Sequence, residues 1–210
     1  MRIAVIGAAG MAGSRVVTEA AGRGHALLAV YRRSRPDTLP PGVTAAGGDA
    51  DDPDSMAALF EGVDAVVAAT RPPAGHEHTI AATTTSLLDA AARTGTRILV
   101  VGGAGPLKVP GRPAQLVLDS PEYVPPQWRT VAAASSAQLA ACRAHPADWV
   151  YLSPPAVLEP GTRTGVYRRG TTTLLTAPDG TSRISAEDLA AAAVDELEMP
   201  YGARHFTVGY

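Results

Sequence analysis

The chain has 210 residues, enough for one domain with a sizeable core, and its formal net charge is −2. Its basic residues are scattered, which argues against a nucleic-acid partner or an anionic membrane surface. No stretch approaches the roughly 20 apolar residues of a membrane span, and the N-terminus runs into a strand pattern instead of a signal peptide. With Cys142 as the only cysteine, the protein is expected to be soluble, reduced and cytoplasmic.

Short apolar runs of strand length alternate with longer, alanine-rich amphipathic runs along the chain. The expected strands span residues 3–6, 26–31, 43–46, 65–69, 98–101 and 149–152. The expected helices span residues 11–22, 54–61, 76–94, 131–144 and 186–197. Unalternating apolar strands separated by helices are typical of a parallel sheet covered on both faces. The sequence therefore predicts a single α/β domain over residues 1–210 with a Rossmann-like, doubly wound parallel sheet.

Two irregular stretches interrupt this alternation, at residues 102–130 and 153–183. The first is rich in glycine and proline, and the second is interpreted as a loop followed by a hairpin that turns at Asp179-Gly180. Ser185 and Asp188 then occupy the N-cap and N3 positions of the last helix. Both stretches follow strands on the carboxyl side of the sheet, where open α/β folds bind ligands. We therefore expect a small substrate lobe of loops and a hairpin toward the C-terminus.

The stretch "VIGAAGMAGSRV" at residues 5–16 places Gly7, Gly10 and Gly13 between the first strand and the first helix. A tight turn, a close approach to pyrophosphate and a close helix–strand crossing each favour a residue without Cβ. The helix N-terminus adds free N–H donors and a positive dipole. The spacing differs by one residue from the G-x-G-x-x-G fingerprint, and a tight βα turn is the alternative. Its position after a strand nevertheless predicts a dinucleotide-binding loop.

Arg32 and Arg33 follow the second strand, where an NAD-binding domain usually offers an acidic side chain to the ribose 2′-hydroxyl. A carboxylate would repel a 2′-phosphate, whereas guanidinium groups form charge-assisted bonds with it. The sequence therefore predicts NADP(H) in preference to NAD(H), with Arg32 as the first candidate because it comes directly off the strand. A solvated loop is the alternative role of either arginine.

Further cofactor candidates stand at the ends of the next two strands. Asp49 follows the third strand and could face the adenine edge or cap the next helix. Ala68, Ala69 and Thr70 end the fourth strand, where small residues let a ribose pass close to the backbone or simply fill the core.

The catalytic apparatus is unknown at this stage. A tyrosine followed four residues later by a lysine is a common proton donor in reductases on this scaffold. Lys108 is the only lysine, and residue 104 is Ala104, so the dyad is absent. His76 and His78 do not share a helix face and no third ligand is indicated, so no metal site is expected. Cys142 is interpreted as a small core residue.

Residues of the irregular stretches are the candidates for the substrate pocket. Tyr123, Trp128 and Leu107 could supply apolar and stacking walls for a planar substrate, with Trp128 as an anchor of its loop in the alternative. Gly103 and Pro154 complete these candidates.

Several segments together resemble the atypical short-chain dehydrogenase/reductases, and most closely the NAD(P)H-binding, NmrA-like proteins related to NADH-flavin reductases and biliverdin-IXβ reductase. The segments are "IGAAGMAGSRV", "YRRSRP", "GDADDPDSMAALFEGVDAVVAAT", "LVVGGAGPL", "WVYLSPPAVLEPGTRTGVYRRG", "DGTSRISAEDLAAAAVDELEMP" and "FTVGY". The resemblance covers essentially the whole chain. It implies a single NAD(P)-binding domain with pyrophosphate at Gly7, Ala8, Gly10, Met11 and Ala12. It also implies nicotinamide near Gly102, Gly103, Ser153, Pro154, Pro155 and Ala156.

One departure from the resemblance is Pro106, where such proteins commonly carry a serine that could orient a substrate carbonyl. Hydride transfer to a flavin suits a site without a strong acid, because the proton can follow from water. The leading hypothesis is therefore an NADPH-dependent reductase of a flavin, quinone or similar planar acceptor, acting as a monomer or homodimer.

Two other hypotheses stay open. A reductase or isomerase of one metabolite would use Tyr123, Tyr151 or Tyr167 as its acid. An NADP(H) sensor would bind the cofactor without turnover and report to a partner.

Overall fold

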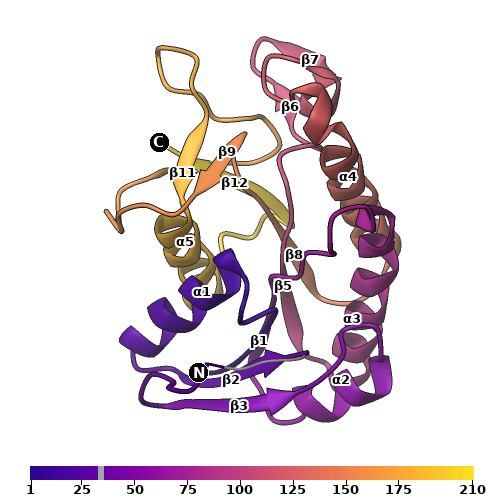
Figure 1. The fold of residues 1–210 in the computed structure, drawn as a ribbon, viewed down its shortest axis with the longest axis vertical. Coiled ribbons are helices and arrows are strands. Elements are labelled where there is room, and N and C mark those ends of the chain that lie inside the picture. The colour runs from indigo at the N-terminus through magenta and orange to yellow at the C-terminus, as the bar shows by residue number, and fades with distance from the viewer. Residues whose placement is uncertain (33–35) are drawn as a thin grey trace.

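The computed structural model describes residues 1–32 and 36–210. Its centre is an eight-stranded sheet that runs vertically through the molecule in Figure 1. From one edge to the other the strands are β10 (Arg168–Gly170), β12 (His205–Gly209), β8 (Trp149–Ser153), β5 (Arg97–Val101), β4 (Ala65–Ala68), β1 (Arg2–Ile6), β2 (Ala26–Tyr31) and β3 (Val43–Gly47). All neighbours pair in parallel except β10, which runs antiparallel to β12.

The strand order reverses at β1. The chain first adds β2 and β3 on one side of β1, and then crosses back to place β4, β5, β8 and β12 on the other side. A crevice opens beyond the carboxyl ends of the strands at such a reversal, which is where doubly wound folds bind their ligands. The topology therefore places the ends of β1 and β4 at the expected binding site.

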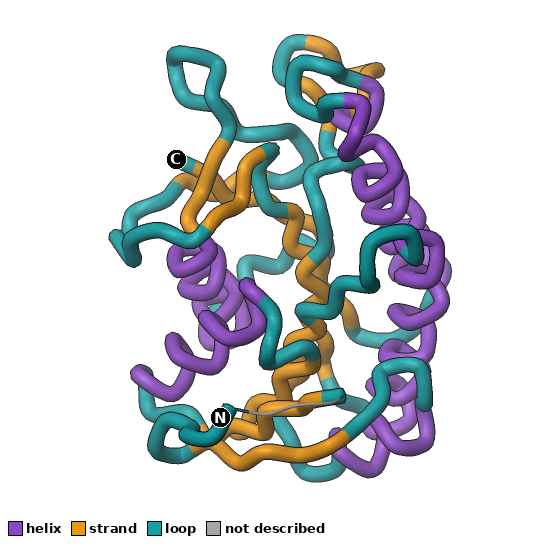
Figure 2. The backbone as a smooth tube through the Cα atoms, viewed as in Figure 1, coloured by secondary structure: helices purple, strands orange, loops and turns teal. Residues whose placement is uncertain are grey.

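Helices cover both faces of the sheet (Figure 1 and Figure 2). They are α1 (Met11–Gly22), α2 (Pro53–Phe60), α3 (Ile80–Thr94), α4 (Arg129–Ala144) and α5 (Ala186–Glu198). The pair α1 and α5 packs together on one face, whereas α2, α3 and α4 pack in a row on the other. Each face has its own apolar core, because the side chains of a strand point alternately to the two sides. The predicted doubly wound fold is confirmed.

The predicted helices are confirmed with small shifts at their ends. Asp52 caps α2 by accepting the backbone N–H groups of Asp54 and Ser55, and Ser185 caps α5 by accepting that of Asp188. The predicted helix at 76–94 starts as a 3-10 turn, η1 (Glu77–Thr79), and becomes α-helical at Ile80. These caps satisfy amide donors that the first turn of a helix leaves without a partner.

The hairpin predicted around Asp179-Gly180 is wrong. A tight turn does form there, with the Ala177 N–H donating to Thr181 O at 2.7 Å, but no ladder extends from it. Instead β9 (Val157–Glu159) and β11 (Arg183–Ser185) pair in parallel as a separate two-stranded sheet. A hairpin forms instead in the first irregular stretch, residues 102–130, where β6 (Lys108–Val109) pairs antiparallel with β7 (Arg112–Leu116). Two short 3-10 turns, η2 (Val117–Asp119) and η3 (Pro126–Trp128), lead from it to α4.

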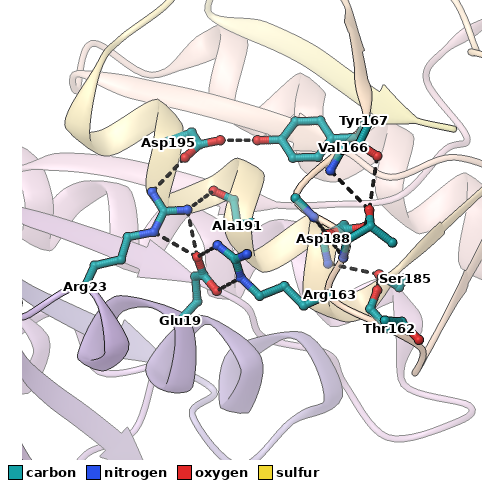
Figure 3. A network of polar contacts seen from close by, with 12 residues as sticks. Glu19, Arg23, Thr162, Arg163, Val166, Tyr167, Ser185, Asp188, Ala191 and Asp195 are labelled. Carbon is teal, nitrogen blue, oxygen red and sulfur yellow. Dashed lines mark hydrogen bonds and ion pairs between the residues drawn. The ribbon is translucent and has the colours of Figure 1, made fainter.

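The segment between β9 and β10 is tied down by polar contacts to α1 and α5 (Figure 3). Arg163 donates two hydrogen bonds to the Glu19 carboxylate, at 2.6 and 2.7 Å. The buried Asp188 carboxylate accepts the backbone N–H groups of Thr164 and Gly165 at 2.9 and 2.8 Å. We call residues 160–166 the strap, because these bonds hold them across the start of α5.

In the parts of the chain that the structure describes, no helix has both the length and the apolar character needed to cross a bilayer.

Candidate functional site

The glycine loop is shaped by contacts that leave no space for a side chain. Gly7 has a φ of +82°, and a Cβ there would lie 2.5 Å from the carbonyl oxygen of Ala69 on the neighbouring strand end. A Cβ at Gly13 would lie 2.1 Å from the Gly7 oxygen. The first turn of α1 therefore sits directly against the loop. Gly10 precedes that helix without a side-chain cap, so the first N–H groups of α1 are free for an anion.

One cavity extends from this loop toward β2 and β3, with a volume of about 280 Å³. Arg32, the first residue after β2, lines it together with Asp51, whose carboxylate accepts a hydrogen bond from Thr83 at 2.5 Å. The other lining residues are Ile6, Gly7, Ala9, Val30, Tyr31, Gly48, Ala50, Thr70, Arg71, Pro72, Pro73, Thr79, Ile80 and Thr83 itself. We call this space the β2 half of the cleft.

A second cavity of about 470 Å³ extends from the same loop toward α4. It is lined by Gly7, Gly10, Met11, Ala12, Ala69, Thr70, Arg71, Pro72, Glu77, Ile80, Val101, Gly102, Gly103, Val131, Ala134, Ser135, Gln138 and Leu158. We call this space the α4 half of the cleft. Gly7, Thr70 and Arg71 line both halves, so the two form one continuous cleft across the end of β1 and β4.

The residues present fit a dinucleotide. The glycine loop offers backbone that a Cβ would block, and α1 offers free N–H groups for the pyrophosphate. The Thr70 hydroxyl is buried between the two halves and has no hydrogen-bond partner among residues 1–32 and 36–210. Buried polar atoms are nearly always paired, so this hydroxyl is available to a ligand in the cleft.

The fold and this cleft together define a dinucleotide-binding protein of the Rossmann type. Comparison of the sequence with protein families agrees, because residues 7–200 match the family described as NAD(P)H-binding. The chain belongs to this family.

Three solved structures are similar over the whole chain. A proposed exported protein from Burkholderia pseudomallei is 38% identical, with a TM-score of 0.89 and coverage of 100% of both chains. A proposed epimerase from Bacteroides thetaiotaomicron is 34% identical, with a TM-score of 0.90 and coverage of 100% of this chain and 96% of that one. A proposed NADH-flavin reductase from Streptococcus pneumoniae TIGR4 is 29% identical, with a TM-score of 0.86 and coverage of 100% and 99%.

Many residues expected at the cofactor site do line the cleft. These are Gly7, Gly10, Met11, Ala12, Arg32, Ala69, Thr70, Gly102 and Gly103. Gly13, Ala8 and Ala68 do not line the cleft: Gly13 packs against the Gly7 carbonyl, and Ala8 and Ala68 are almost fully buried. Arg33 lies outside the described residues.

Other expected cofactor residues lie away from the cleft. Asp49 is exposed and accepts the Asp51 N–H in a turn, so neither role expected for it is observed: Asp52 caps the helix and Asp51 lines the cleft. Ser153, Pro154 and Pro155 are buried, and Ala156 follows them toward β9.

Ser153 shows why the end of β8 is closed. Its hydroxyl pairs with Nε2 of His205 on β12 at 2.9 Å, and β12 was not among the expected strands. Burial lowers the pKa of His205 to about 4. The imidazole is therefore neutral near pH 7 and belongs to the sheet core.

The residues expected to form an aromatic substrate wall are dispersed. Leu107 is completely buried in a small cluster with Val109 and Leu174, and Tyr123 packs against the same cluster. Pro106 sits in the turn that the Leu107 N–H closes onto Ala104. The expected role of Leu107 and Tyr123 in the cleft is therefore wrong, because the β6–β7 hairpin builds its own core.

Trp128 is 52% exposed on η3, and the guanidinium of Arg71 lies 6.0 Å from its ring centre. Since Arg71 lines both halves of the cleft, Trp128 stands beside the entrance rather than inside it. This cation–π contact also anchors the turn that precedes α4.

The tyrosines considered as acids do not line the cleft. Tyr151 is fully buried, and Tyr167 is bonded to Asp195 of α5, which also pairs with Arg23 of α1 (Figure 3). Burial raises the pKa of both phenols, and it also raises that of Tyr123. A raised pKa by itself would suit a general acid, so it is their placement that argues against such a role.

Sequence reasoning missed Asp51, Arg71, Glu77, Gln138 and Leu158 as cleft residues. The sequence does indicate part of the α4 wall, because residues 131, 134, 135 and 138 have the spacing of one helix face. A Tyr–Lys dyad on that wall would occupy two positions four residues apart. Ala134 and Gln138 have this spacing, but their side chains cannot act as such a dyad. The only lysine, Lys108, is exposed on β6.

Proposed function

We propose that this protein is an NADPH-dependent reductase that delivers hydride to a flavin or a similar planar conjugated acceptor. The observation that carries the cofactor preference is Arg32, which lines the β2 half of the cleft directly after β2. NAD-binding domains usually present a carboxylate to the ribose 2′-hydroxyl at this point. A guanidinium there attracts a 2′-phosphate instead, through charge-assisted hydrogen bonds.

The remaining cofactor contacts follow from the cleft. The free N–H groups at the start of α1 would hold the pyrophosphate, and the unpaired Thr70 hydroxyl would bind a ribose. Asp51 would accept the adenine amino group, because the Thr83 hydroxyl holds its carboxylate at the wall of the β2 half. Arg71 lines both halves and would add a positive charge beside the phosphates.

The α4 half supports the choice of acceptor. Its wall is largely apolar, with Met11, Ile80, Val101, Val131 and Leu158 among the lining side chains. The bound nicotinamide would supply a hydride, and the one proton that completes the reduction of the acceptor would come from water. The protein then needs only to bring two planar rings together and exclude side reactions, so an α4 half with no tyrosine or lysine among its described lining residues is sufficient. The name of the Streptococcus pneumoniae relative points to the same acceptor class.

The direct test is a titration with NADPH and with NADH, followed by addition of riboflavin, FMN or a quinone while reduced-cofactor absorbance is recorded. We expect NADPH to bind about ten- to hundredfold more tightly than NADH and to be oxidised when a flavin is added. Tight NADPH binding with no oxidation by any acceptor would contradict the reductase and favour a cofactor sensor. Equal binding of the two cofactors would contradict the role of Arg32.

A further inference from the structure

The α4 wall of the cleft carries one polar side chain whose hydrogen-bonding capacity exceeds the contacts that it makes. Gln138 lines the α4 half and is only 3% exposed. Its neighbours on the same face, Val131 and Ala134, are apolar, and the Ser135 hydroxyl donates to the backbone oxygen of Ala132 at 2.8 Å. Gln138 is therefore the carboxamide that an acceptor in this half would meet on α4.

Two buried partners fix the orientation of this amide. The single proton of the Tyr151 hydroxyl is shared between Gln138 Oε1, at 3.1 Å, and the backbone oxygen of Ser135, at 2.9 Å. The Gln138 Nε2 group donates to the Thr84 hydroxyl on α3 at 3.1 Å. Tyr151 and Thr84 are almost completely buried, so the amide is held from behind by two different elements. A side chain anchored in this way loses little conformational freedom when a ligand binds.

The anchoring leaves part of the amide unused. A carboxamide has two N–H donors and two acceptor lone pairs. Tyr151 and Thr84 occupy one donor and one lone pair, which leaves one N–H and one lone pair for a ligand. This count stays the same if the amide oxygen and nitrogen are exchanged. Gln138 therefore brings to the wall of the cleft a neutral donor and a neutral acceptor that have no other partner among the described residues.

This pair is complementary to a lactam or imide edge, in which a C=O and an N–H are adjacent. Resting on the proposed reductase function, we propose that Gln138 binds the lactam edge of the acceptor and selects this chemical class. Flavins and linear tetrapyrroles carry such an edge, whereas simple quinones carry only carbonyl oxygens. Because Gln138 is buried and neutral, it gives no charge compensation to an acceptor that places a carboxylate or phosphate against it.

The experiment compares acceptors that differ only at this edge. Lumiflavin has an imide N–H, and N3-methyllumiflavin replaces that N–H by a methyl group. With the wild-type protein we expect a KM for lumiflavin about tenfold below that for the methylated ring, equal to about 1.4 kcal/mol. With Gln138→Leu the two values should become equal, through a rise in the KM of lumiflavin, while the KM of menadione changes less than about twofold.

Three controls separate a binding role from a structural one. Gln127→Leu alters an exposed glutamine on η3 and should leave all KM values unchanged. The Kd for NADPH should be the same in Gln138→Leu as in the wild type. If Gln138→Leu folds poorly, Thr84→Val keeps the amide in the cleft, removes one anchor and should narrow the preference for lumiflavin by about threefold.

Other outcomes would overturn the proposal in distinguishable ways. An equal loss of activity toward lumiflavin and menadione would show that Gln138 only supports the fold, and an unchanged preference would show that it does not meet the acceptor. If the wild type binds NADPH but none of the tested acceptors causes its oxidation, the proposed function fails. Quenching of riboflavin fluorescence by the NADP⁺-loaded protein and by Gln138→Leu would then still test the contact, and equal quenching by both would overturn it.

Discussion

The glycine loop and the remaining wall of the α4 half are built in different ways. The loop is mostly backbone and comes from one short stretch, Gly7 to Gly13, in which neighbouring turns touch without side chains between them. The α4 half instead collects side chains from α4, from Leu158 on β9 and from residues 71–80, which are distant in sequence. The first construction is sensitive to a single added atom. The second depends on the long-range contacts that hold separate segments in place.

The sharpest test of the first construction is Gly13→Ala. The added Cβ would lie 2.1 Å from the Gly7 oxygen, so the loop must move and carry the pyrophosphate donors with it. We expect the affinity for NADPH to fall by about hundredfold or more, together with a loss of roughly 1–3 kcal/mol in the free energy of unfolding. Fluorescence titration of NADPH and thermal melting measure both effects.

Gly22→Ala is the matched control, because it lies in the same helix and its Cβ would meet nothing within 4 Å. It should leave the Kd for NADPH unchanged and stabilise α1 by up to about 1 kcal/mol. If Gly13→Ala behaves like Gly22→Ala, the loop does not form the cofactor floor.

A smaller and more selective effect is expected from Arg32→Ala. Removal of one charge-assisted contact should weaken NADPH binding by about ten- to hundredfold and change NADH binding by less than about twofold. The same titration in rising salt should show a smaller salt dependence for the variant, because the contact that it lacks is ionic. Arg112→Ala serves as the control, because it removes an exposed guanidinium on β7 that is paired with Glu122. Equal losses for NADPH and NADH would indicate a general role of Arg32 instead of a contact to the 2′-phosphate.

The α4 half is tested by Asp188→Asn, which removes hydrogen bonds to the strap and alters no residue that lines the cleft. Asp188 accepts hydrogen bonds from Thr164, Gly165 and Tyr210, and an amide cannot accept all of them. We expect a loss of roughly 1–3 kcal/mol in the free energy of unfolding. Because the strap follows β9, the KM of the acceptor should rise severalfold while the Kd for NADPH stays the same. A parallel loss of cofactor binding would contradict the separation of the two halves.

The same residue predicts a pH dependence. Burial would raise the pKa of the Asp188 carboxyl, but the hydrogen bonds from Thr164, Tyr210 and the Gly165 backbone outweigh it and hold the pKa below its usual value of 3.8. Stability from such a group is fully present above the unfolded-state pKa and is lost as the pH falls through the lower native pKa. The wild type should therefore lose stability below about pH 4, and Asp188→Asn should lose less over that interval. Urea unfolding at pH 7 and at pH 3 gives the comparison.

The glycine loop and the strands around it could be predicted from the sequence because their signals are local. Apolar runs that lack alternation mark strands buried on both faces, and a glycine triplet between such a strand and a helix marks the loop. Even here the precision was limited to a few residues. The carboxylate that lines the cleft is Asp51 and not Asp49, because the chain turns between them before α2 begins.

The α4 half and the irregular stretches could not be predicted in the same way, because their residues are placed by pairings between distant segments. Ser153 is buried by its bond to His205, 52 residues later, and Leu107 is buried by packing against Leu174. No local pattern reveals such partners. The turn at Asp179-Gly180 shows the converse error, since its local signal is genuine but the flanking chain pairs with β9 instead of folding back on itself.

The smallest effects on kcat and KM are expected when the hydroxyls of the three tyrosines considered as proton donors are removed. Tyr167→Phe breaks a bond to Asp195 of α5, and Tyr123→Phe alters a ring packed on the hairpin cluster. Neither side chain lines the cleft, so kcat with a flavin should change by less than about twofold for both. Tyr151→Phe removes an anchor of Gln138, so it should raise the KM of lumiflavin by about threefold and leave kcat and its pH profile unchanged. A pH-dependent fall in kcat in any of the three variants would instead identify that phenol as a proton donor. The α4 half would then have to rearrange to bring the phenol to the acceptor.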